Sequence, residues 1–272
     1  MSACVGDGLK KLVAEVNQPE TEETLKQEWQ NEFSNKGKNH YTDVYNAGIV
    51  HYHGWQEAAD LHVDAVKTTS DHPRIIDAGG GTGRMVQKMK ERFPNADIEL
   101  LDSNPDMTEY ALKNGISQKN INISDVTDMK LGGKKVGEGT RVPDASIDHV
   151  YSHSVIWMLE DPSKFFQEAS RVLKKKGTLS VSTATPSPAN SLARRQFISG
   201  LEKDMDNAAA DGQISAEVKN GMMAANKYFN LKVVKVPTVE ELKGMAAQYG
   251  LKLIMTKPIY DGLFVFLSFE KL

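Results

Sequence analysis

Apolar segments of strand length alternate with amphipathic segments from about Asp71 to the end of the chain. Short apolar runs bounded by turn residues predict buried strands, whereas apolar residues that recur every three or four positions predict helices. The predicted strands are 74–78, 98–102, 121–126, 147–154, 178–183 and, as a terminal hairpin, 251–257 and 263–269. This alternation predicts an α/β protein with a doubly wound sheet.

Capping residues support the helices that the pattern predicts. Asn104 and Asp161 each precede a proline, which is the arrangement of an N-cap followed by the first helical residue. Thr238 and Glu241 have the spacing of a capping box. Glycines that permit the left-handed backbone of a helix end are the predicted stops, at Gly115, Gly177 and Gly250.

Two helical segments stand outside the alternation. Residues 1–70 are predicted to be helical, with Trp55, Ala59, His62 and Val66 on one face of a helix. Residues 186–235, also mostly helical, interrupt the alternation of strands and helices after the fifth strand. We therefore expect an N-terminal helical lid over 1–70 and a second domain over 71–272 that carries a helical insertion at 186–235. The glycine- and lysine-rich segments 34–39 and 132–139 are expected to be exposed loops.

Composition narrows the classes of partner. The chain has 272 residues with a formal charge of −3, 40% hydrophobic residues and a mean hydropathy of −0.44. The sequence shows no cluster of Lys and Arg that would bind nucleic acid or an anionic membrane. It also shows no apolar run as long as a signal peptide or a membrane span. Its single cysteine, Cys4, excludes an intrachain disulfide. We expect a cytoplasmic monomer or homodimer with a small-molecule substrate and neither nucleic acid nor membrane as partner.

The most informative motif is the glycine-rich turn after the first strand, IIDAGGGTGRM. A dinucleotide fingerprint counted from Gly79 would need its third glycine at Arg84, and a P-loop would need a Gly-Lys-Ser/Thr that is absent. What remains is an acidic residue, Asp77, before a turn on which an amino acid and a nucleoside can lie against bare backbone. Asp77 can orient turn amides or meet a ligand ammonium through water. The cofactor-binding candidates in the turn itself are Gly79, Gly80, Gly81 and Gly83.

Two further carboxylates end the next two strands. Asp102, 19 residues after Gly83, can accept hydrogen bonds from both ribose hydroxyls. Asp125 is placed for an adenine amine, and the Val126 amide is available to a ring nitrogen. Any one of these aspartates can also be a strand-end cap. Together with the glycines, the three carboxylates predict a ribonucleoside site at the carboxyl edge of the sheet.

The segments DAGGGTG, ELLDSNPDM, ISDV and PDASIDHVYSHSVIWML…DPSKFFQEASRVLKKKGTLSVS resemble class I S-adenosylmethionine (SAM)-dependent methyltransferases. The likeness covers 71–184 strongly and 236–272 moderately, and the chain is similar in particular to the broad group that contains the ubiquinone and menaquinone C-methyltransferases and many small-molecule methyltransferases. It implies a Rossmann-like seven-stranded sheet of order 3-2-1-4-5-7-6, with the last strand antiparallel. It also implies SAM as cofactor, as methyl donor or co-substrate, above strands one to four. From the same segments we add three cofactor-binding candidates, Ser103, Met107 and Ser152.

The chain departs from the family pattern at three places. Lys175-Lys176-Gly177 replaces the usual Lys-Pro-Gly-Gly before strand five, and Ser103-Asn104-Pro105 stands near the common Ser-Pro. A histidine common after the fourth strand is replaced by Trp157, so a catalytic histidine cannot be assumed at that position.

Methyl transfer from a sulfonium is an in-line displacement, for which a general base is optional. His153, at the end of the fourth predicted strand, is the candidate base, although it can equally point to the opposite face and pack. In similar enzymes an N-terminal tyrosine covers the cofactor, so Tyr41, Tyr45 and Tyr52 are candidates, with Tyr45 also a catalytic candidate. An aromatic face can hold a sulfonium by cation–π attraction.

The acceptor site is less well specified. Trp157, Arg194 and Tyr228 are the substrate-binding candidates; the methionines and aromatic residues of 186–235 suit either an apolar pocket wall or core. Arg194 can meet a substrate carboxylate or face water. Four histidines between His40 and His62 lack a third ligand at metal-binding spacing, so we predict no metal site.

Three functions are compatible with these residues. The first is a SAM-dependent methyltransferase acting on an N, O or C atom of a small molecule. The second is a SAM-consuming enzyme that transfers the aminocarboxypropyl group or cyclises SAM, and releases methylthioadenosine. The third is a non-catalytic SAM-binding regulatory protein.

Overall fold

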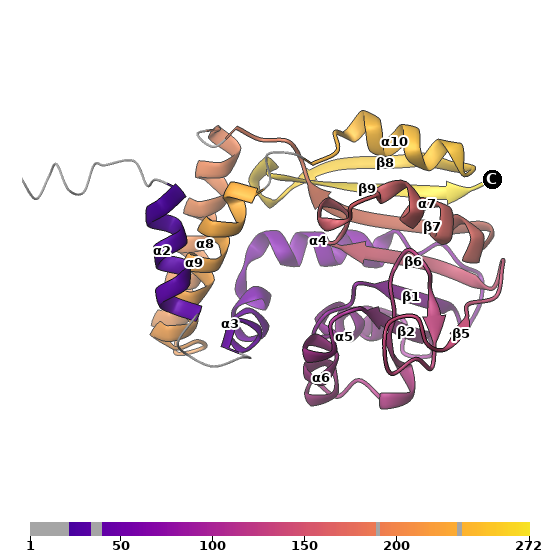
Figure 1. The fold of residues 1–272 in the computed structure, drawn as a ribbon, viewed down its shortest axis with the longest axis horizontal. Coiled ribbons are helices and arrows are strands. Elements are labelled where there is room, and N and C mark those ends of the chain that lie inside the picture. Colours follow the sequence, from indigo (N-terminus) through magenta and orange to yellow (C-terminus); the bar gives the residue numbers. More distant parts are fainter. Residues whose placement is uncertain (1–21, 34–39, 189–190, 233–235) are drawn as a thin grey trace, which may run out of the picture.

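The structure is a computed structural model that describes residues 22–33, 40–188, 191–232 and 236–272. Seven strands form one sheet of order β3-β2-β1-β6-β7-β9-β8 (Figure 1). β9 runs antiparallel to both of its neighbours, and the other pairs are parallel. Counted among themselves, these strands have the predicted order 3-2-1-4-5-7-6, which confirms the Rossmann-like fold. The strands are β1 (Arg74–Ala78), β2 (Asp97–Asp102), β3 (Ile121–Ile123), β6 (Ile147–His153), β7 (Leu173–Ala184), β8 (Leu251–Ile259) and β9 (Phe264–Lys271).

Helices cover both faces of the sheet, and each face has its own apolar core. Ala58 of α4, Met89 of α5 and Ala111 of α6 are buried against one face. Phe166 of α7 and Leu242 of α10 are buried against the other. The bounds of these helices are α4 (His53–Asp64), α5 (Arg84–Arg92), α6 (Pro105–Lys113), α7 (Pro162–Val172) and α10 (Val239–Gln248).

The predicted helix starts are confirmed. The Asn104 side chain accepts a hydrogen bond from the Asp106 amide, and the Asp161 side chain accepts one from the Ser163 amide. Thr238 and Glu241 form the capping box. These caps satisfy amides that the first helical turn leaves without a partner.

The predicted end of the helix at Gly177 is wrong. α7 ends at Val172, and the chain enters β7 directly, where the fully buried Leu173 pairs with Ile147. The register then shifts so that His149 pairs with Thr178. Burial of Leu173 in the sheet core therefore outweighs continuation of the helix into the three lysines.

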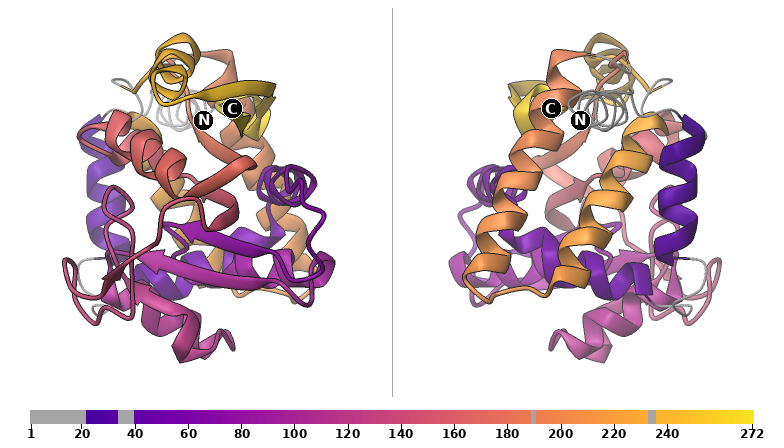
Figure 2. Two further views of the ribbon diagram at one scale, coloured as in Figure 1. Left: turned by 90° about the vertical axis from the view of Figure 1, so that its right-hand side faces the viewer. Right: turned by 90° about the vertical axis from the view of Figure 1, so that its left-hand side faces the viewer.

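A second group of helices lies beyond the carboxyl ends of the parallel strands (Figures 1 and 2). Helix α9 packs against α2, α3 and α8, so N-terminal and inserted segments form one layer. Trp29 stacks on Tyr228 inside this layer. These elements are α2 (Glu22–Phe33), α3 (His40–Gly48), the 3-10 turn η1 (Ile49–His51), α8 (Leu192–Ala210) and α9 (Ala216–Lys232).

The described part of the predicted lid has two roles. The stripe of Trp55, Ala59 and His62 on α4 is buried against the sheet, as the spacing predicted. The helices before it belong to the layer at the strand ends. The division at residue 70 stays a prediction, and residues 1–21 and 34–39 lie outside the described residues.

Short elements complete the fold. Between β3 and β6 the segment 132–139 joins two strands of a small second sheet and is mostly exposed, as expected. In the described ranges no helix has the length and apolar character needed to cross a membrane. The remaining short elements are η2 (Gln118–Asn120), β4 (Lys130–Leu131), β5 (Thr140–Arg141), η3 (Ile156–Met158) and η4 (Tyr260–Gly262).

Candidate active site

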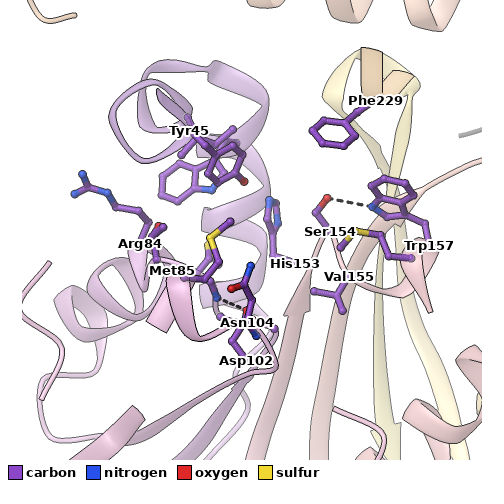
Figure 3. A pocket seen from close by; sticks show the side chains of 18 of the residues that line it. Tyr45, Arg84, Met85, Asp102, Asn104, His153, Ser154, Val155, Trp157 and Phe229 are labelled. Carbon is purple, nitrogen blue, oxygen red and sulfur yellow. Dashed lines mark hydrogen bonds between the residues drawn. The ribbon is translucent and has the colours of Figure 1, made fainter. Parts of the chain in front are cut away.

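A cavity of about 550 Å³ opens at the carboxyl ends of β1, β2 and β6, under α3, α8 and α9 (Figure 3). One part is lined by the glycine turn and the strand-end carboxylates, and the other by aromatic side chains. The predicted site residues that line it are Tyr41, Tyr45, Asp77, Gly79, Gly80, Gly81, Asp102, Ser103, Met107, Asp125, Val126, His153 and Trp157.

The glycine turn has a left-handed backbone at alternate residues, with φ of 80° at Gly79, 53° at Gly81 and 77° at Gly83. A Cβ at Gly79 would lie 2.3 Å from a methyl carbon of Val155, whereas one at Gly81 would meet no atom within 4 Å. Glycine is therefore required sterically at the first position and leaves open space at the second. Gly83 is the N-cap residue of α5 and is not part of the cavity lining, and a Cβ there would lie 2.7 Å from Ile116.

Asp102 braces this turn from the end of β2. Its Oδ2 accepts a hydrogen bond from the Gly81 amide at 2.9 Å, and its Oδ1 accepts one from the Asn104 amide at 2.8 Å. Burial raises the pKa of Asp102, and the two amides oppose that rise. A carboxylate has about four acceptor positions, so these two bonds leave capacity for ligand hydroxyls.

Asp77 lies beneath the turn and is buried. Its Oδ2 makes no hydrogen bond to any residue in the described ranges. Burial raises the pKa of Asp77 to about 8, opposed by the neighbouring Tyr151 hydroxyl. A buried carboxylate oxygen without a partner is costly, and a cationic ligand group, directly or through water, would supply the missing partner.

Asp125 and Val126 follow β3 at the far side of the glycine turn. Asp125 Oδ1 accepts hydrogen bonds from the amide and the hydroxyl of Thr127, both at 2.8 Å. This Asx turn fixes the backbone at the cavity wall. The carboxylate thus has a structural role as well as a place beside the cavity.

His153 points from the end of β6 into the cavity (Figure 3). Its Nδ1 lies 2.7 Å from Ser182 Oγ, and its Nε2 lies 2.8 Å from the Tyr260 hydroxyl. Burial lowers the pKa of His153 to about 4, so the imidazole is neutral near pH 7. Its neighbour Ser152 faces the other way and donates a hydrogen bond to the Ala78 carbonyl at 2.8 Å, outside the cavity lining.

The three lid tyrosines divide between cavity and core. Tyr41 and Tyr45 line the cavity, and burial raises the pKa of Tyr45 to about 12, so its phenol is protonated at neutral pH. Tyr52 does not line the cavity. It is buried beside Phe197, and its hydroxyl donates to Asp261 Oδ2 at 3.0 Å.

Of the three predicted acceptor residues, Trp157 lines the cavity, and its indole nitrogen donates to Ser154 Oγ at 3.3 Å. Arg194 is buried and donates to the Ser187 carbonyl, which fixes the start of α8. Tyr228 stacks on Trp29, with ring centroids 5.2 Å apart. Neither Arg194 nor Tyr228 is part of the cavity lining.

Sequence reasoning missed several lining residues. Phe197 lies one helical turn after Arg194, and Phe229 directly follows Tyr228. Tyr260 was predicted only as part of the hairpin connection, yet it lines the cavity with a φ of 53°. The Asp-Gly pair that follows it was the available signal for a left-handed backbone in this connection.

Arg84 ties the lid to the glycine turn. Its Nε donates to Asn46 Oδ1 at 3.1 Å, and its Nη2 donates to the Asn46 carbonyl at 3.1 Å. Asn114 Nδ2 donates to the same Asn46 oxygen at 2.7 Å. These bonds join α3, α5 and the end of α6 on one side of the cavity.

The histidines between 40 and 62 do not converge on one site. His62 is buried, His53 pairs with Asp204 at 2.5 Å, and His40 lies 3.1 Å from Glu32. Glu217 stands near the His40 pair, 3.9 Å from its Nε2.

The order and directions of the seven strands are those of the Rossmann-like fold of the class I SAM-dependent methyltransferases. Residues 76–181 match the family described as "Methyltransferase domain". This domain belongs to that class, whose cofactor is SAM.

Curated relatives match over part of their length. The malonyl-[acyl-carrier protein] O-methyltransferase of Hahella chejuensis is 40% identical over 110 residues, which cover 40% of this chain and 36% of that protein. An enzyme of the same name from Ilyobacter polytropus is 29% identical over 111 residues, covering 40% and 37%. The chain thus spans little more than a third of the curated relatives' length.

Solved structures share the fold. A SAM-dependent methyltransferase from Mesorhizobium loti has a TM-score of 0.53 at 18% identity, covering 79% of this chain and 98% of that one. The plantazolicin methyltransferase BpumL in complex with SAH has a TM-score of 0.53 at 12% identity, covering 99% and 100%.

Proposed function

We propose that the protein transfers the methyl group of SAM to a small-molecule acceptor. One observation carries this proposal: a single cavity joins the braced glycine turn and three strand-end aspartates to a pocket of aromatic side chains. Both reactants can therefore lie in one space, lined in part by residues of α3, α8 and α9. Holding reactants at attack distance is the main task of a catalyst for this displacement.

The residues present fit the cofactor. The free acceptor capacity of Asp102 suits ribose hydroxyls, and the partnerless Asp77 Oδ2 suits the ammonium group. Asp125 and Val126 line the same cavity, where the carboxylate would suit an adenine amine and the Val126 amide a ring nitrogen. When bound, SAM supplies an electrophilic methyl group. Protein side chains orient the acceptor toward it and receive the acceptor's proton.

The other half of the cavity suits an uncharged acceptor with apolar surface. Its walls include Tyr41, Trp157, Phe197, Phe229 and Phe264. Among the described residues that line the cavity, Arg84 alone has a cationic side chain. Its guanidinium already donates to Asn46 and Gln87. Malonyl-acyl-carrier protein, which the curated relatives' names give as their substrate, is the comparison acceptor for an assay.

The test is product analysis by mass spectrometry. Purified protein is incubated with SAM carrying a ¹³C-labelled methyl group, with and without pooled small metabolites or malonyl-acyl-carrier protein. The proposal predicts S-adenosylhomocysteine and a labelled product in equal amounts only when an acceptor is present. Release of methylthioadenosine would refute methyl transfer and favour aminocarboxypropyl transfer or cyclisation of SAM. Binding of SAM without turnover would favour a regulatory protein.

A further inference from the structure

A continuous row of buried hydrogen bonds runs from the cavity into the sheet. It alternates between imidazole and hydroxyl groups and ends on a backbone carbonyl. In order, its members are Tyr260, His153, Ser182, His62, Ser180, His149, Thr178 and the carbonyl of Ala65. The seven successive donor–acceptor distances are 2.8, 2.7, 3.0, 2.8, 3.1, 2.7 and 3.0 Å.

The fold places these groups on one face of the sheet. His149 and His153 alternate along β6, and the three hydroxyl residues alternate along β7. The strands are paired so that His149 lies opposite Thr178 and His153 opposite Ser182. His62 enters the row from α4 above the strands. Apart from His153 and Tyr260, which border the cavity, the side chains of the row are 0% exposed.

The Ala65 carbonyl fixes the direction of the row. A carbonyl can only accept, so the Thr178 hydroxyl donates to it and must accept from His149 Nδ1. A neutral imidazole that donates at Nδ1 accepts at Nε2, so the Ser180 hydroxyl donates to His149. The same rule repeats through His62, Ser182 and His153. At the cavity end, the Tyr260 hydroxyl donates to His153 Nε2.

A charged imidazole does not fit this row. A protonated histidine donates at both nitrogens, which would leave the hydrogen of a neighbouring buried hydroxyl without an acceptor. Burial also lowers the pKa of each of the three histidines below its ordinary value. All three are therefore neutral and carry their hydrogen on Nδ1.

Tyr260 lines the cavity and its hydrogen is committed to the row, so a lone pair is what its oxygen can offer to a ligand there. We propose that Tyr260 selects methyl acceptors that carry a hydrogen on the reacting atom, such as a hydroxyl or a neutral amine, over carboxylates. The inference rests on the proposed function. A carboxylate would face this lone pair unless the row reversed, and reversal would remove the hydrogen bond to Ala65.

Tyr260, whose hydroxyl bonds to His153, has an uncommon backbone conformation. Tyr260, Asp261 and Gly262 are all left-handed, with φ of 53°, 54° and 85°. The Asp261 carboxylate accepts from Tyr52 at 3.0 Å and lies 3.5 Å from His53 Nε2. Strain of this kind persists where surrounding contacts over-determine the geometry, and it clusters at functional sites.

Methyl transfer is coupled to a proton transfer through Tyr260. The acceptor atom forms a bond to the methyl carbon while the carbon–sulfur bond breaks with its electron pair left on sulfur. The acceptor's hydrogen passes to the Tyr260 oxygen as the Tyr260 hydrogen passes to His153 Nε2. His153 is charged only in this step, while the Tyr260 hydroxyl is turned toward the cavity, and it returns the proton to solvent through Tyr260 when the cavity opens, which restores the neutral row.

The direct test is ¹⁵N–¹H long-range correlation NMR of the histidine rings in the intact protein at pH 7. We expect His62, His149 and His153 to be neutral with the hydrogen on Nδ1, the less common form of free histidine. Hydrogen on Nε2 in all three would mean that the row is reversed and would overturn the proposal. An imidazolium signal from any of them would also overturn it.

Substitutions then connect the row to acceptor choice. The probes are catechol, phenethylamine and malonyl-N-acetylcysteamine, the last of which supplies a carboxylate. Tyr260→Phe should lower kcat/KM for catechol or phenethylamine at least tenfold, whereas kcat/KM for the carboxylate probe should stay equal or rise because the opposing lone pair is gone. Ser182→Ala, which lies outside the cavity lining, should release His153 to the Nε2–H form and lower kcat for the same two probes.

Ser170→Ala is the matched control, because Ser170 is a buried serine whose hydroxyl donates to the Tyr249 carbonyl outside the row. It should leave acceptor choice unchanged. A wild-type enzyme that methylates only the carboxylate probe would refute the selection by Tyr260 but leave the methyltransferase proposal intact. Absence of SAM binding would refute the methyltransferase proposal, while the NMR spectrum would still decide the row.

Discussion

Replacing Asp102 by alanine separates its two roles, as a brace of the glycine turn and as a ribose ligand. The bonds from the Gly81 and Asn104 amides exist without ligand, so their loss lowers the free energy of unfolding by about 1.5–3 kcal/mol. The ribose contact exists only in the complex. Its loss, a charge-assisted hydrogen bond of about 1.5–3 kcal/mol, raises the Kd for SAM roughly 10- to 150-fold.

Isothermal titration calorimetry with SAM measures the second effect, and urea unfolding without ligand measures the first. Asp97→Ala is the matched control, because Asp97 is exposed at the opposite end of the same strand and accepts only from Asn120 among the described hydrogen bonds. Its Kd should change less than about twofold. If Asp102→Ala remains folded and binds SAM as tightly as the wild type, the ribose assignment is wrong.

Three other perturbations test the account. Gly79→Ala, whose Cβ would lie 2.3 Å from Val155, should lower the unfolding free energy by about 2 kcal/mol or more in urea titrations; an unaffected variant would show that the turn can relax. Gly244→Ala, in α10 with no atom within 4 Å of the new Cβ, should raise it by about 0.5–1 kcal/mol. The pKa of His149 is lowered to about 3 in the folded state, so this histidine takes up a proton only on unfolding. The pKa values of His62 and His153 are lowered too, so His149 should add its own share, about 1.4 kcal/mol per pH unit, to the fall of the unfolding free energy below about pH 6. The slope for His149→Gln should be smaller by that amount, and equal slopes in the two proteins would contradict the buried row.

The sheet and the nucleoside side of the cavity were predictable because they depend on local patterns. Asp77 and Asp102 lie at the carboxyl ends of β1 and β2, and Asp125 follows β3; the carboxyl ends of parallel strands meet at one edge of the sheet. The order of residues along the chain therefore places these groups together without further knowledge of packing.

The acceptor side could not be predicted in the same way. Phe197 and Arg194 lie one helical turn apart on α8, and only the packing of that helix decides which of them faces the cavity. Tyr52 was expected over the cofactor but packs in the core, because Asp261 offers its hydroxyl a partner from a segment 209 residues away. The position of Tyr260 in the cavity wall depends on the left-handed backbone of the turn 260–262, which packs against segments distant in sequence.

The most direct test of the central claim is a crystal structure of the protein with S-adenosylhomocysteine. The account predicts the ribose hydroxyls on Asp102, the amino group toward Asp77 and the adenine beside Asp125 and Val126, with the sulfur facing the aromatic half of the cavity. A nucleoside bound elsewhere, or a sulfur directed away from His153 and Tyr260, would contradict it.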